Sequence, residues 1–388
     1  MKRSIVMIIT ALIISATIIP TPSFASEIKV DLAENAKSAI LIERDTGTVL
    51  FEKNSDERLS PASMTKIMTM LLIMEALEDG KIQWNEKVRT SEYAASMGGS
   101  QVFLEEGEEM TVDELLRAIS ISSANDASVA MAERIAGSEK QFVKMMNQKA
   151  KELGLKDTKF QNATGLPAKN HYSSARDMAI LAKELLKHEK ITNYTSQYES
   201  YLREGTDKKF WLVNTNRLVK FYPGVDGLKT GFTKEAKYCL TATAKKGDMR
   251  VIAVVFGAPT SKERNKLITE MFDYAFSQYE TKQFYAKGDE LGKVTVEKGQ
   301  QRNIKIAAGE SISLLTKKGE KMDDVKTSLK LNKHIQAPIK KGDEIGKIVL
   351  IKNGKVLSEN SAIAAENVKP ASWWTLYKRS FSMFTKLQ

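Results

Sequence analysis

The pattern of strand-like and helix-like segments changes once, near Tyr279, and this change limits what the chain can fold into. From about Ala36 to Tyr279 the two kinds of segment alternate, which is typical of one large mixed domain. Beyond Tyr279, short alternating strands with glycine turns replace the helical pattern. Because 388 residues also exceed one typical domain, we expect an α/β (α+β) domain with an antiparallel sheet and a helical lobe, followed by a small β-sandwich domain.

Within the large domain, the local patterns predict individual elements. A hairpin is expected over 38–42 and 48–51, turning at Gly47. Ser60 is expected to cap a helix with Pro61 in its first turn, and the apolar run from Ile67 to Leu77 places that helix at the centre. The remaining predictions are helices over 112–136, 139–153 and 174–188, strands over 227–232, 238–244 and 250–256, and a closing helix over 271–279.

The β-rich part contains an internal near-repeat. Lys287–Val294 reads KGDELGKV, and Lys341–Ile348 reads KGDEIGKI. Two copies are too few for a solenoid, so we expect two similar hairpins of one sandwich.

The first 25 residues have the pattern of a signal peptide. Lys2 and Arg3 precede an apolar run over 5–19, and small residues at Ser23 and Ala25 suit cleavage before Ser26. The alternative is an uncleaved membrane anchor, but the run is shorter than the roughly 20 apolar residues that a spanning helix needs. We therefore expect secretion across the cytoplasmic membrane.

The last 20 residues, 369–388, predict an amphipathic helix. After Pro370, aromatic residues recur at helical spacing among basic ones. This favours a helix lying on the outer leaflet of the membrane, giving peripheral attachment, and the alternative is a helix that docks on the β domain. The aromatic residues are Trp373, Trp374, Tyr377, Phe381 and Phe384, and the basic ones are Lys378, Arg379 and Lys386. The expected boundaries are thus 1–25, 26–279, 280–368 and 369–388.

Composition narrows the possible partners. The net charge of +11 is spread along the chain, so nucleic acid is not a favoured partner. Cys239 is the only cysteine, which excludes an internal disulfide, and its apolar neighbours predict burial. No two of the three histidines have a metal-ligand spacing, so we expect no metal and no cofactor.

Three short motifs in the large domain carry the reactive side chains. They are Ser63-Met64-Thr65-Lys66, Ser123-Ala124-Asn125 and Lys229-Thr230-Gly231. Each motif alone is a weak signal. The three together are a strong one, because each lies on the predicted element that its role requires.

Ser63 and Lys66 share a helix face at a helix start, where free N–H groups stabilise negative charge. Lys66 can act as a base only if it is uncharged, which burial and a second cation at Lys229 would both favour. The alternative is a helix cap with a solvated lysine.

The other two motifs supply polar groups for a substrate. Ser123 and Asn125 interrupt a helical pattern, so they could relay a proton and bind peptide backbone, although ordinary helix capping is the alternative. Lys229 and Thr230 lie on a predicted edge strand and could hold a carboxylate. Gly231 leaves room for a peptide, and the next amide, of Phe232, could face the reacting carbonyl.

With these motifs, the sequence resembles the penicillin-recognising serine enzymes. More narrowly, it is similar to the D-alanyl-D-alanine carboxypeptidases among the low-molecular-mass penicillin-binding proteins, including sporulation-linked members of Gram-positive rods. Phe160–Leu166, Ser173–Met178 and Asp226-Gly227 add to the likeness. The resemblance implies a β-lactamase/transpeptidase-like domain and a role in peptidoglycan maturation and sporulation.

The resemblance also implies a role for each motif residue. Ser63 would be the nucleophile, Lys66 the base, Ser123 the proton relay and Asn125 a substrate ligand. Lys229, Thr230 and Gly231 would bind substrate, and the backbone amides of Ser63 and Phe232 would form the oxyanion hole. The chain departs from many relatives at Ala124, where they have glycine, and some have histidine in place of Phe232.

The implied reaction removes the terminal D-alanine from peptidoglycan stem peptides that end in D-Ala-D-Ala, through an acyl-serine that β-lactams would also form. Two rival functions stay open. A β-lactamase would need a deacylating carboxylate, and no Glu-x-x-Leu-Asn pattern follows Asn125. A catalytically inert wall-binding protein could keep the fold, although all the reactive residues are present.

Overall fold

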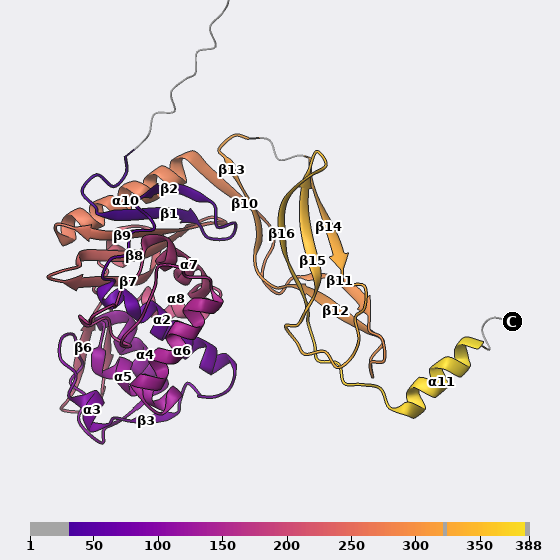
Figure 1. Ribbon diagram of the computed structural model, residues 1–388, viewed down its shortest axis with the longest axis horizontal. Coiled ribbons are helices and arrows are strands. Elements are labelled where there is room, and N and C mark those ends of the chain that lie inside the picture. Colours follow the sequence, from indigo (N-terminus) through magenta and orange to yellow (C-terminus); the bar gives the residue numbers. More distant parts are fainter. Residues whose placement is uncertain (1–30, 321–323, 385–388) are drawn as a thin grey trace, which may run out of the picture. The chain divides into compact units, whose positions relative to one another are not determined.

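The computed structural model describes residues 31–320 and 324–384, with side chains described as far as Arg379 (Figure 1). The expected signal peptide over 1–25 lies outside these residues. None of the described helices is both long enough and apolar enough to cross a membrane.

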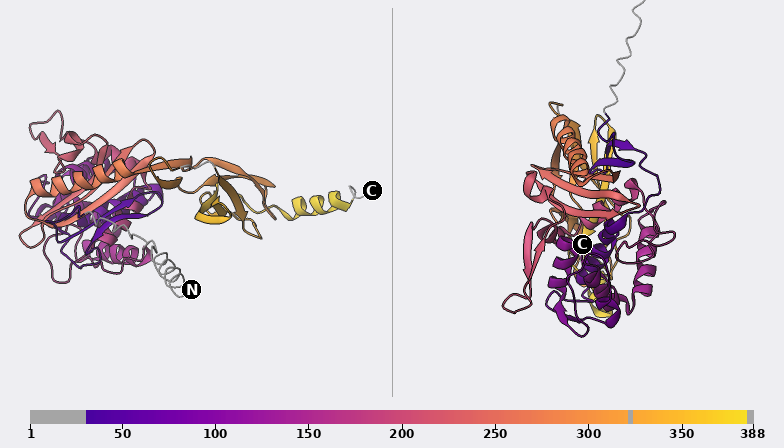
Figure 2. Two further views of the ribbon diagram at one scale, coloured as in Figure 1. Left: turned by 90° about the horizontal axis from the view of Figure 1, so that it is seen from above. Right: turned by 90° about the vertical axis from the view of Figure 1, so that its left-hand side faces the viewer.

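A five-stranded sheet organises the larger part, in the order β2-β1-β9-β8-β7 with antiparallel neighbours. Successive residues of β1 enter two different apolar cores: Ile40 and Ile42 pack with the helical lobe, whereas Ala39 and Leu41 pack with α10. Helix α10 covers that second face (Figures 1 and 2). The strands are β1 Ser38–Glu43, β2 Val49–Lys53, β7 Val225–Thr233, β8 Lys237–Lys246 and β9 Met249–Ala258.

The helical lobe packs on the other face of the sheet, and its central helix α2 is buried on nearly all sides, as its apolar sequence predicted. The helices of the larger part are α2 Lys66–Glu78, α3 Glu92–Ala95, α4 Val112–Arg117, α5 Asn125–Ala136, α6 Glu139–Glu152, α7 Ala175–Leu185, α8 Thr192–Thr195, α9 Leu218–Phe221 and, on the opposite face of the sheet, α10 Ser261–Gln278. Short turns η1 Ala62–Thr65, η2 Ala118–Ser122 and η3 Glu189–Ile191, and strands β3 Lys87–Arg89, β4 Glu109–Thr111, β5 Glu199–Leu202 and β6 Phe210–Val213, complete it.

Two helix starts differ from the sequence prediction. The helix that carries Lys66 opens with the tight 3-10 turn η1, and Pro61, not Ser60, is its N-cap, without a side-chain capping bond. The Met64 N–H donates to the Pro61 carbonyl oxygen instead, at 3.0 Å. Helix α10 begins at Ser261, ten residues before the predicted start at 271, because Thr260 caps it there. The prediction missed the first half of this helix because polar residues outnumber the apolar ones in it.

The β-rich part contains the strands β10 Tyr279–Tyr285, β11 Glu290–Thr295, β12 Asn303–Ala308, β13 Ile312–Lys317, β14 Val325–Leu331, β15 Glu344–Lys352 and β16 Lys355–Ala364. Five of them form the sheet β11-β12-β16-β15-β14, and β10 pairs with β13. Helix α11 follows over Trp373–Phe384.

The near-repeat in this part forms two equivalent turns, which lead into β11 and β15. Gly288 and Gly342 both have positive φ, of 89° and 95°. In each turn the aspartate that directly precedes the strand closes the loop: Asp289 accepts from the Ala286 N–H and Asp343 from the Lys340 N–H, both at 2.7 Å. The expected two hairpins correspond to the antiparallel pairs β11 with β12 and β15 with β16 of one sheet, but their connecting loops, 296–302 and 353–354, differ in length.

Candidate active site

The side chains of Ser63 and Lys66 meet at the start of the central helix. Ser63 lies in η1, and Lys66 is the first residue of α2. Their spacing of three residues puts Lys66 Nζ 3.2 Å from Ser63 Oγ. Lys66 is fully buried, whereas Ser63 is partly exposed. A hydroxyl that a substrate can reach is therefore in contact with an amine that water cannot reach.

Two further contacts orient the Lys66 amine. Nζ donates to the Asn125 side-chain oxygen at 2.6 Å and to the Thr164 backbone oxygen at 2.7 Å. Both partners can only accept, so they occupy the two N–H groups of an uncharged amine. The lone pair of that amine is then left for the third contact, the Ser63 hydroxyl.

Electrostatics favour the uncharged form of Lys66. Burial and the positive charge of Lys229 lower the pKa of Lys66 well below its usual value, and Asp126 opposes them more weakly. A buried lysine whose pKa is lowered in this way is suited to accept a proton from a neighbouring hydroxyl.

Ser123 and Asn125 enter the site through a break between two helices. The wide turn η2 leads to Ser123, whose φ of 66° is in the left-handed region, and α5 begins at Asn125. The Asn125 amide is held by the Gly98 oxygen at 2.7 Å, and its backbone N–H donates to the Ser100 oxygen at 2.7 Å. The Ser123 hydroxyl is buried and has no hydrogen-bond partner among the described residues, so it is available to a substrate.

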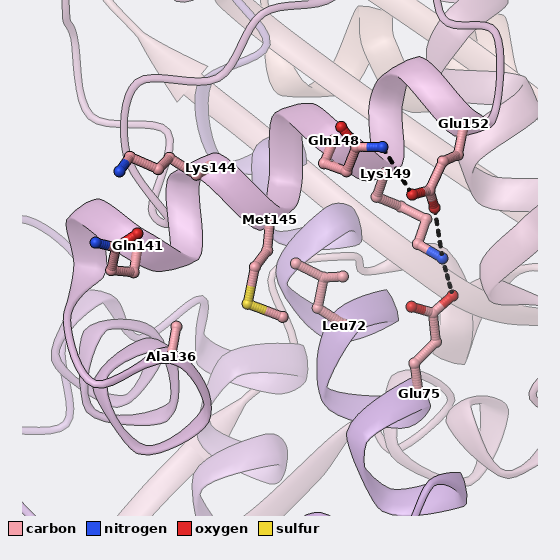
Figure 3. A pocket seen from close by; sticks show the side chains of 9 residues that line it. All are labelled: Leu72, Glu75, Ala136, Gln141, Lys144, Met145, Gln148, Lys149 and Glu152. Carbon is pink, nitrogen blue, oxygen red and sulfur yellow. Dashed lines mark hydrogen bonds and ion pairs between the residues drawn. The ribbon is translucent and has the colours of Figure 1, made fainter.

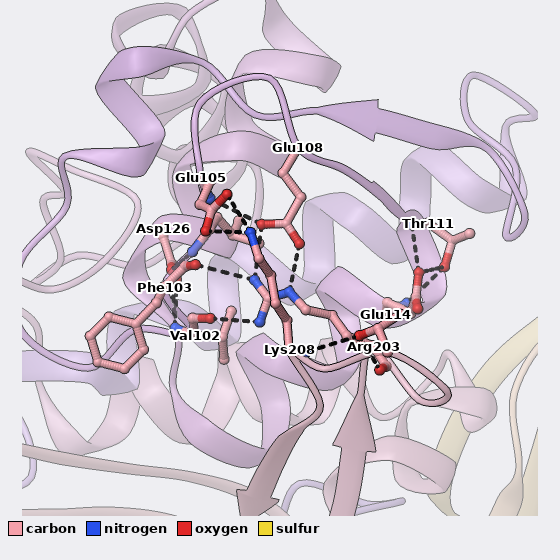
Figure 4. A network of polar contacts seen from close by, with 11 residues as sticks. Val102, Phe103, Glu105, Glu108, Thr111, Glu114, Asp126, Arg203 and Lys208 are labelled. Atoms are coloured by element: carbon pink, nitrogen blue, oxygen red, sulfur yellow. Dashed lines mark hydrogen bonds and ion pairs between the residues drawn. The ribbon is translucent and has the colours of Figure 1, made fainter.

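A buried carboxylate fixes the loop that holds Asn125. Asp126 accepts from the Val102 and Leu104 N–H groups at 3.0 and 3.1 Å (Figure 4). The Arg203 guanidinium also binds this loop. It donates to the Val102 oxygen at 3.1 Å and to both carboxylate oxygens of Glu108. This network keeps one wall of the site rigid before any substrate binds.

The opposite wall is β7, the last strand in the order of the sheet. Lys229 is fully buried, and burial together with the Arg264 guanidinium lowers its pKa to about 7. The Thr230 hydroxyl donates to the Thr215 hydroxyl at 2.7 Å, and the Thr215 N–H reaches the Ile121 oxygen at 3.2 Å. Thr215 thus joins β7 to the turn that precedes Ser123.

Two glycines let the walls of the site approach closely. A Cβ on Gly231 would lie 2.7 Å from the Pro61 oxygen and 3.3 Å from the Met64 N, on either side of Ser63. A Cβ on Gly165 would lie 1.8 Å from the Ala62 oxygen and 2.9 Å from the Ser63 N. These contacts bring β7 and the loop after Phe160 against the turn that carries Ser63.

His171 links the loop after Phe160 to the turn that carries Ser63, without contacting Ser63 or Lys66. Its Nδ1 accepts from the Gln161 N–H at 3.2 Å, so Nε2 carries the proton and donates to the Thr65 hydroxyl at 2.8 Å. Burial lowers the pKa of His171 to about 4, which keeps the ring uncharged at neutral pH.

The structure therefore brings the three motifs together. Lys66 contacts both Ser63 and Asn125, Lys229 acts on Lys66 through its charge, and Gly231 flanks Ser63. The Phe232 side chain is exposed beyond them. Sequence reasoning missed the supporting residues Asp126, Thr164, Thr215, His171 and Arg264, because single polar residues without a motif spacing give no local signal.

The described pockets elsewhere contain no motif residue. The groove of about 560 Å³ between α2, α5 and α6 is lined by Leu72, Met145 and several charged and amide side chains (Figure 3). The Lys149 ammonium there is already paired with Glu75 at 2.8 Å and with Glu152 at 3.4 Å. No group in this groove resembles the reactive set around Ser63.

Comparison with known proteins gives a consistent result. The family model described as D-alanyl-D-alanine carboxypeptidase matches residues 25–260, and the model of the penicillin-binding protein 5 C-terminal domain matches residues 279–370. The chain is 65% identical to the D-alanyl-D-alanine carboxypeptidase DacF of Bacillus subtilis, over 92% of each chain. It is 36% identical to DacC of Escherichia coli, over 91% of this chain and 89% of that one.

Solved structures agree with the sequence comparison. Penicillin-binding protein 5 from Haemophilus influenzae matches with a TM-score of 0.66 and 33% identity, covering 86% of this chain and 98% of that one. Penicillin-binding protein D2 from Listeria monocytogenes in its ampicillin-bound form matches with a TM-score of 0.58 and 32% identity, covering 64% of this chain and all of that one.

Proposed function

Because the chain belongs to the D-alanyl-D-alanine carboxypeptidase family, we propose that this serine-type carboxypeptidase removes the terminal D-alanine of peptidoglycan stem peptides through an acyl-serine at Ser63. The observation that supports this mechanism best is the orientation of the Lys66 amine. Its two N–H groups have carbonyl-type acceptors, and its lone pair is left for the Ser63 hydroxyl.

In the proposed acylation, Ser63 Oγ attacks the carbonyl between the two D-alanines while its proton passes to Lys66 Nζ. The backbone N–H groups of Ser63 and Phe232 stabilise the oxyanion. The C–N bond then breaks, and the proton reaches the leaving amine through Lys66 and the Ser123 hydroxyl. Water hydrolyses the ester by the same route in reverse, restoring the Ser63 hydroxyl.

The substrate carboxylate is assigned to Lys229 and Thr230. The Lys229 ammonium supplies the charge, and Asn125 and Gly231 position the peptide backbone. In the structure the Thr230 hydroxyl donates its single proton to Thr215. When the carboxylate binds, the Thr230 hydroxyl donates to it instead and accepts the proton of the Thr215 hydroxyl.

The two lysines give the proposed reaction opposite pH requirements. Lys66 must lose its proton, so activity rises as pH increases through the pKa of Lys66. Lys229 must keep its proton, so carboxylate binding weakens as pH rises above about 7.

The variant Lys229→Gln is therefore expected to change both limbs of the pH profile of acylation. Removing the Lys229 charge raises the pKa of Lys66, because the repulsion that lowers it is lost. The acid limb should move to higher pH, and the alkaline limb near 7 should disappear. Lys245→Gln, which changes an exposed lysine, is the control. An unmoved acid limb would mean that Lys229 does not act on the base.

β-Lactams are expected to acylate the same serine. They present a similar carbonyl and carboxylate, but the amine that is cut remains attached and blocks the entry of water. The likeness to a structure solved in its ampicillin-bound form supports this proposal. Rapid turnover of a penicillin would favour a β-lactamase instead.

The direct test of the proposed function is incubation of the purified enzyme with a wall pentapeptide that ends in D-Ala-D-Ala. We expect free D-alanine and the corresponding tetrapeptide. An unchanged pentapeptide under conditions where the protein is folded would contradict the proposal and favour an inert wall-binding protein.

We also propose that the protein is secreted and attached peripherally to the outer leaflet through α11, while its role in sporulation stays a prediction. In support, Trp373, Trp374 and Tyr377 are 70%, 64% and 50% exposed. Rings of this kind partition to the membrane interface. The side chains of Phe381, Phe384 and Lys386 lie outside those described.

Deleting residues 371–388 is expected to move the enzyme from the membrane fraction to the soluble fraction with unchanged D-alanine release. Fractionation of cells that express each form measures this. Equal membrane partition of both forms would exclude α11 as the anchor.

A further inference from the structure

A polar cavity of about 570 Å³ adjoins the candidate active site. Three chain segments line it, and each leads directly to the catalytic residues. Ser60 lies three residues before Ser63, Pro167 lies two residues after Gly165, and Glu235 lies three residues after Phe232. Gly165 and Gly231 both pack against the turn that carries Ser63. All three segments that line the cavity therefore start from the neighbourhood of Ser63.

The direction of a bound peptide follows from the proposed carboxypeptidase reaction, on which this inference rests. Along β7, the carboxylate site at Lys229 and Thr230 comes first, and the amide of Phe232 that faces the reacting carbonyl comes next. A peptide lying along this edge strand must therefore continue beyond Phe232, toward Glu235, with the residues that precede the two D-alanines.

The cavity carries two charges that the protein leaves uncompensated. Glu235 and Lys169 are exposed, and neither side chain has a hydrogen bond or ion pair within the described part of the chain. Arg58, the other cation of the lining, is already used: it pairs with Asp157 at 2.9 Å and covers the ring of Tyr172. One anion and one cation are thus free to meet a ligand.

We propose that this cavity is a subsite for the charged side chain of the stem residue that precedes D-Ala-D-Ala, a diamino acid. Its side-chain ammonium group binds Glu235, and a carboxylate beside that ammonium, where the residue has one, binds Lys169. Glu235 lies in the turn that follows β7, three residues after Phe232. A peptide that continues past Phe232 by one further residue of about 3.4 Å, with an extended four-carbon stem of about 6 Å, extends toward this turn.

The test compares two peptides that differ only at this side chain. One carries L-lysine before D-Ala-D-Ala with a free ε-amine, and in the other the amine is acetylated. Glu235→Gln should lower kcat/KM for the free-amine peptide about three- to five-fold, the effect of one exposed ion pair, mainly through KM. It should leave the acetylated peptide unchanged, because that peptide offers no ammonium group to Glu235.

The control variant is Glu204→Gln, which removes another exposed glutamate that does not line this cavity. A peptide with meso-diaminopimelate in place of lysine adds the carboxylate, and Lys169→Gln should lower kcat/KM for this peptide but not for the lysine peptide. These selective losses should shrink in 0.5 M salt, which screens exposed charges.

The outcomes separate this inference from the function on which it rests. If D-alanine is released from both peptides and Glu235→Gln affects them equally or not at all, the subsite is refuted while the carboxypeptidase reaction stands. If neither peptide releases D-alanine, the proposed function itself fails.

Discussion

Replacing Ser63 with alanine is expected to lower D-alanine release from a wall pentapeptide by at least about 10⁴-fold. The variant keeps the buried Lys66 amine but has no oxygen to form the ester, and water is not positioned in its place. The fold should be retained, because the Ser63 hydroxyl has only the one contact with Lys66 among the described residues. Release of D-alanine and the melting temperature are measured together on the same preparation.

Ser261→Ala is the matched control for this variant. Ser261 is exposed at the start of α10 and lines none of the described pockets. Its activity should stay within a few-fold of wild type. A Ser63→Ala enzyme with near-normal turnover would show that the acyl-serine route is wrong.

Gly165→Ala is expected to have the largest effect on stability, about 3 kcal/mol or more. Gly165 has φ of 84°, and an added Cβ would lie 1.8 Å from the Ala62 oxygen and 2.4 Å from its carbonyl carbon. Backbone atoms cannot rotate away as a side chain can, so the loop must move. That movement would also break the bond between the Thr164 oxygen and Lys66 Nζ, and D-alanine release should fall with it.

Gly154→Ala separates steric overlap from backbone strain. Gly154 has a similar φ of 70°, but a Cβ there would meet nothing within 4 Å. This control should cost only about 1 kcal/mol. Urea denaturation of both variants measures the difference, and equal losses would show that close packing at Gly165 is unimportant.

The family and the main elements could be predicted because their signals are local. Residues three apart, such as Ser63 and Lys66, share one face of a helix wherever the helix begins. The apolar run after them predicted that this helix is buried at the centre of the domain. The break at Ser123 was visible as an interruption of a helical pattern, and the structure places a left-handed residue there. The resemblance drawn from the three motifs is confirmed at the level of the family.

The orientation of the Lys66 amine could not be predicted, because it depends on contacts that only the fold creates. Asn125 is 59 residues from Lys66 and Thr164 is 98 residues away. Thr164 acts through its backbone oxygen, which every residue type has, so the sequence gives no indication of it. Ser60 was predicted as a cap from its residue type alone, but the tight turn of η1 leaves no place for that bond.

Everything proposed for the mechanism depends on Ser63 being a nucleophile that the uncharged Lys66 activates. The most direct measurement is the intact mass of the enzyme after incubation with a labelled penicillin, followed by mapping of the modified peptide. We predict one adduct per chain, on Ser63, and none on Ser63→Ala. An unmodified wild-type enzyme, or an adduct that persists in the alanine variant, would contradict the account.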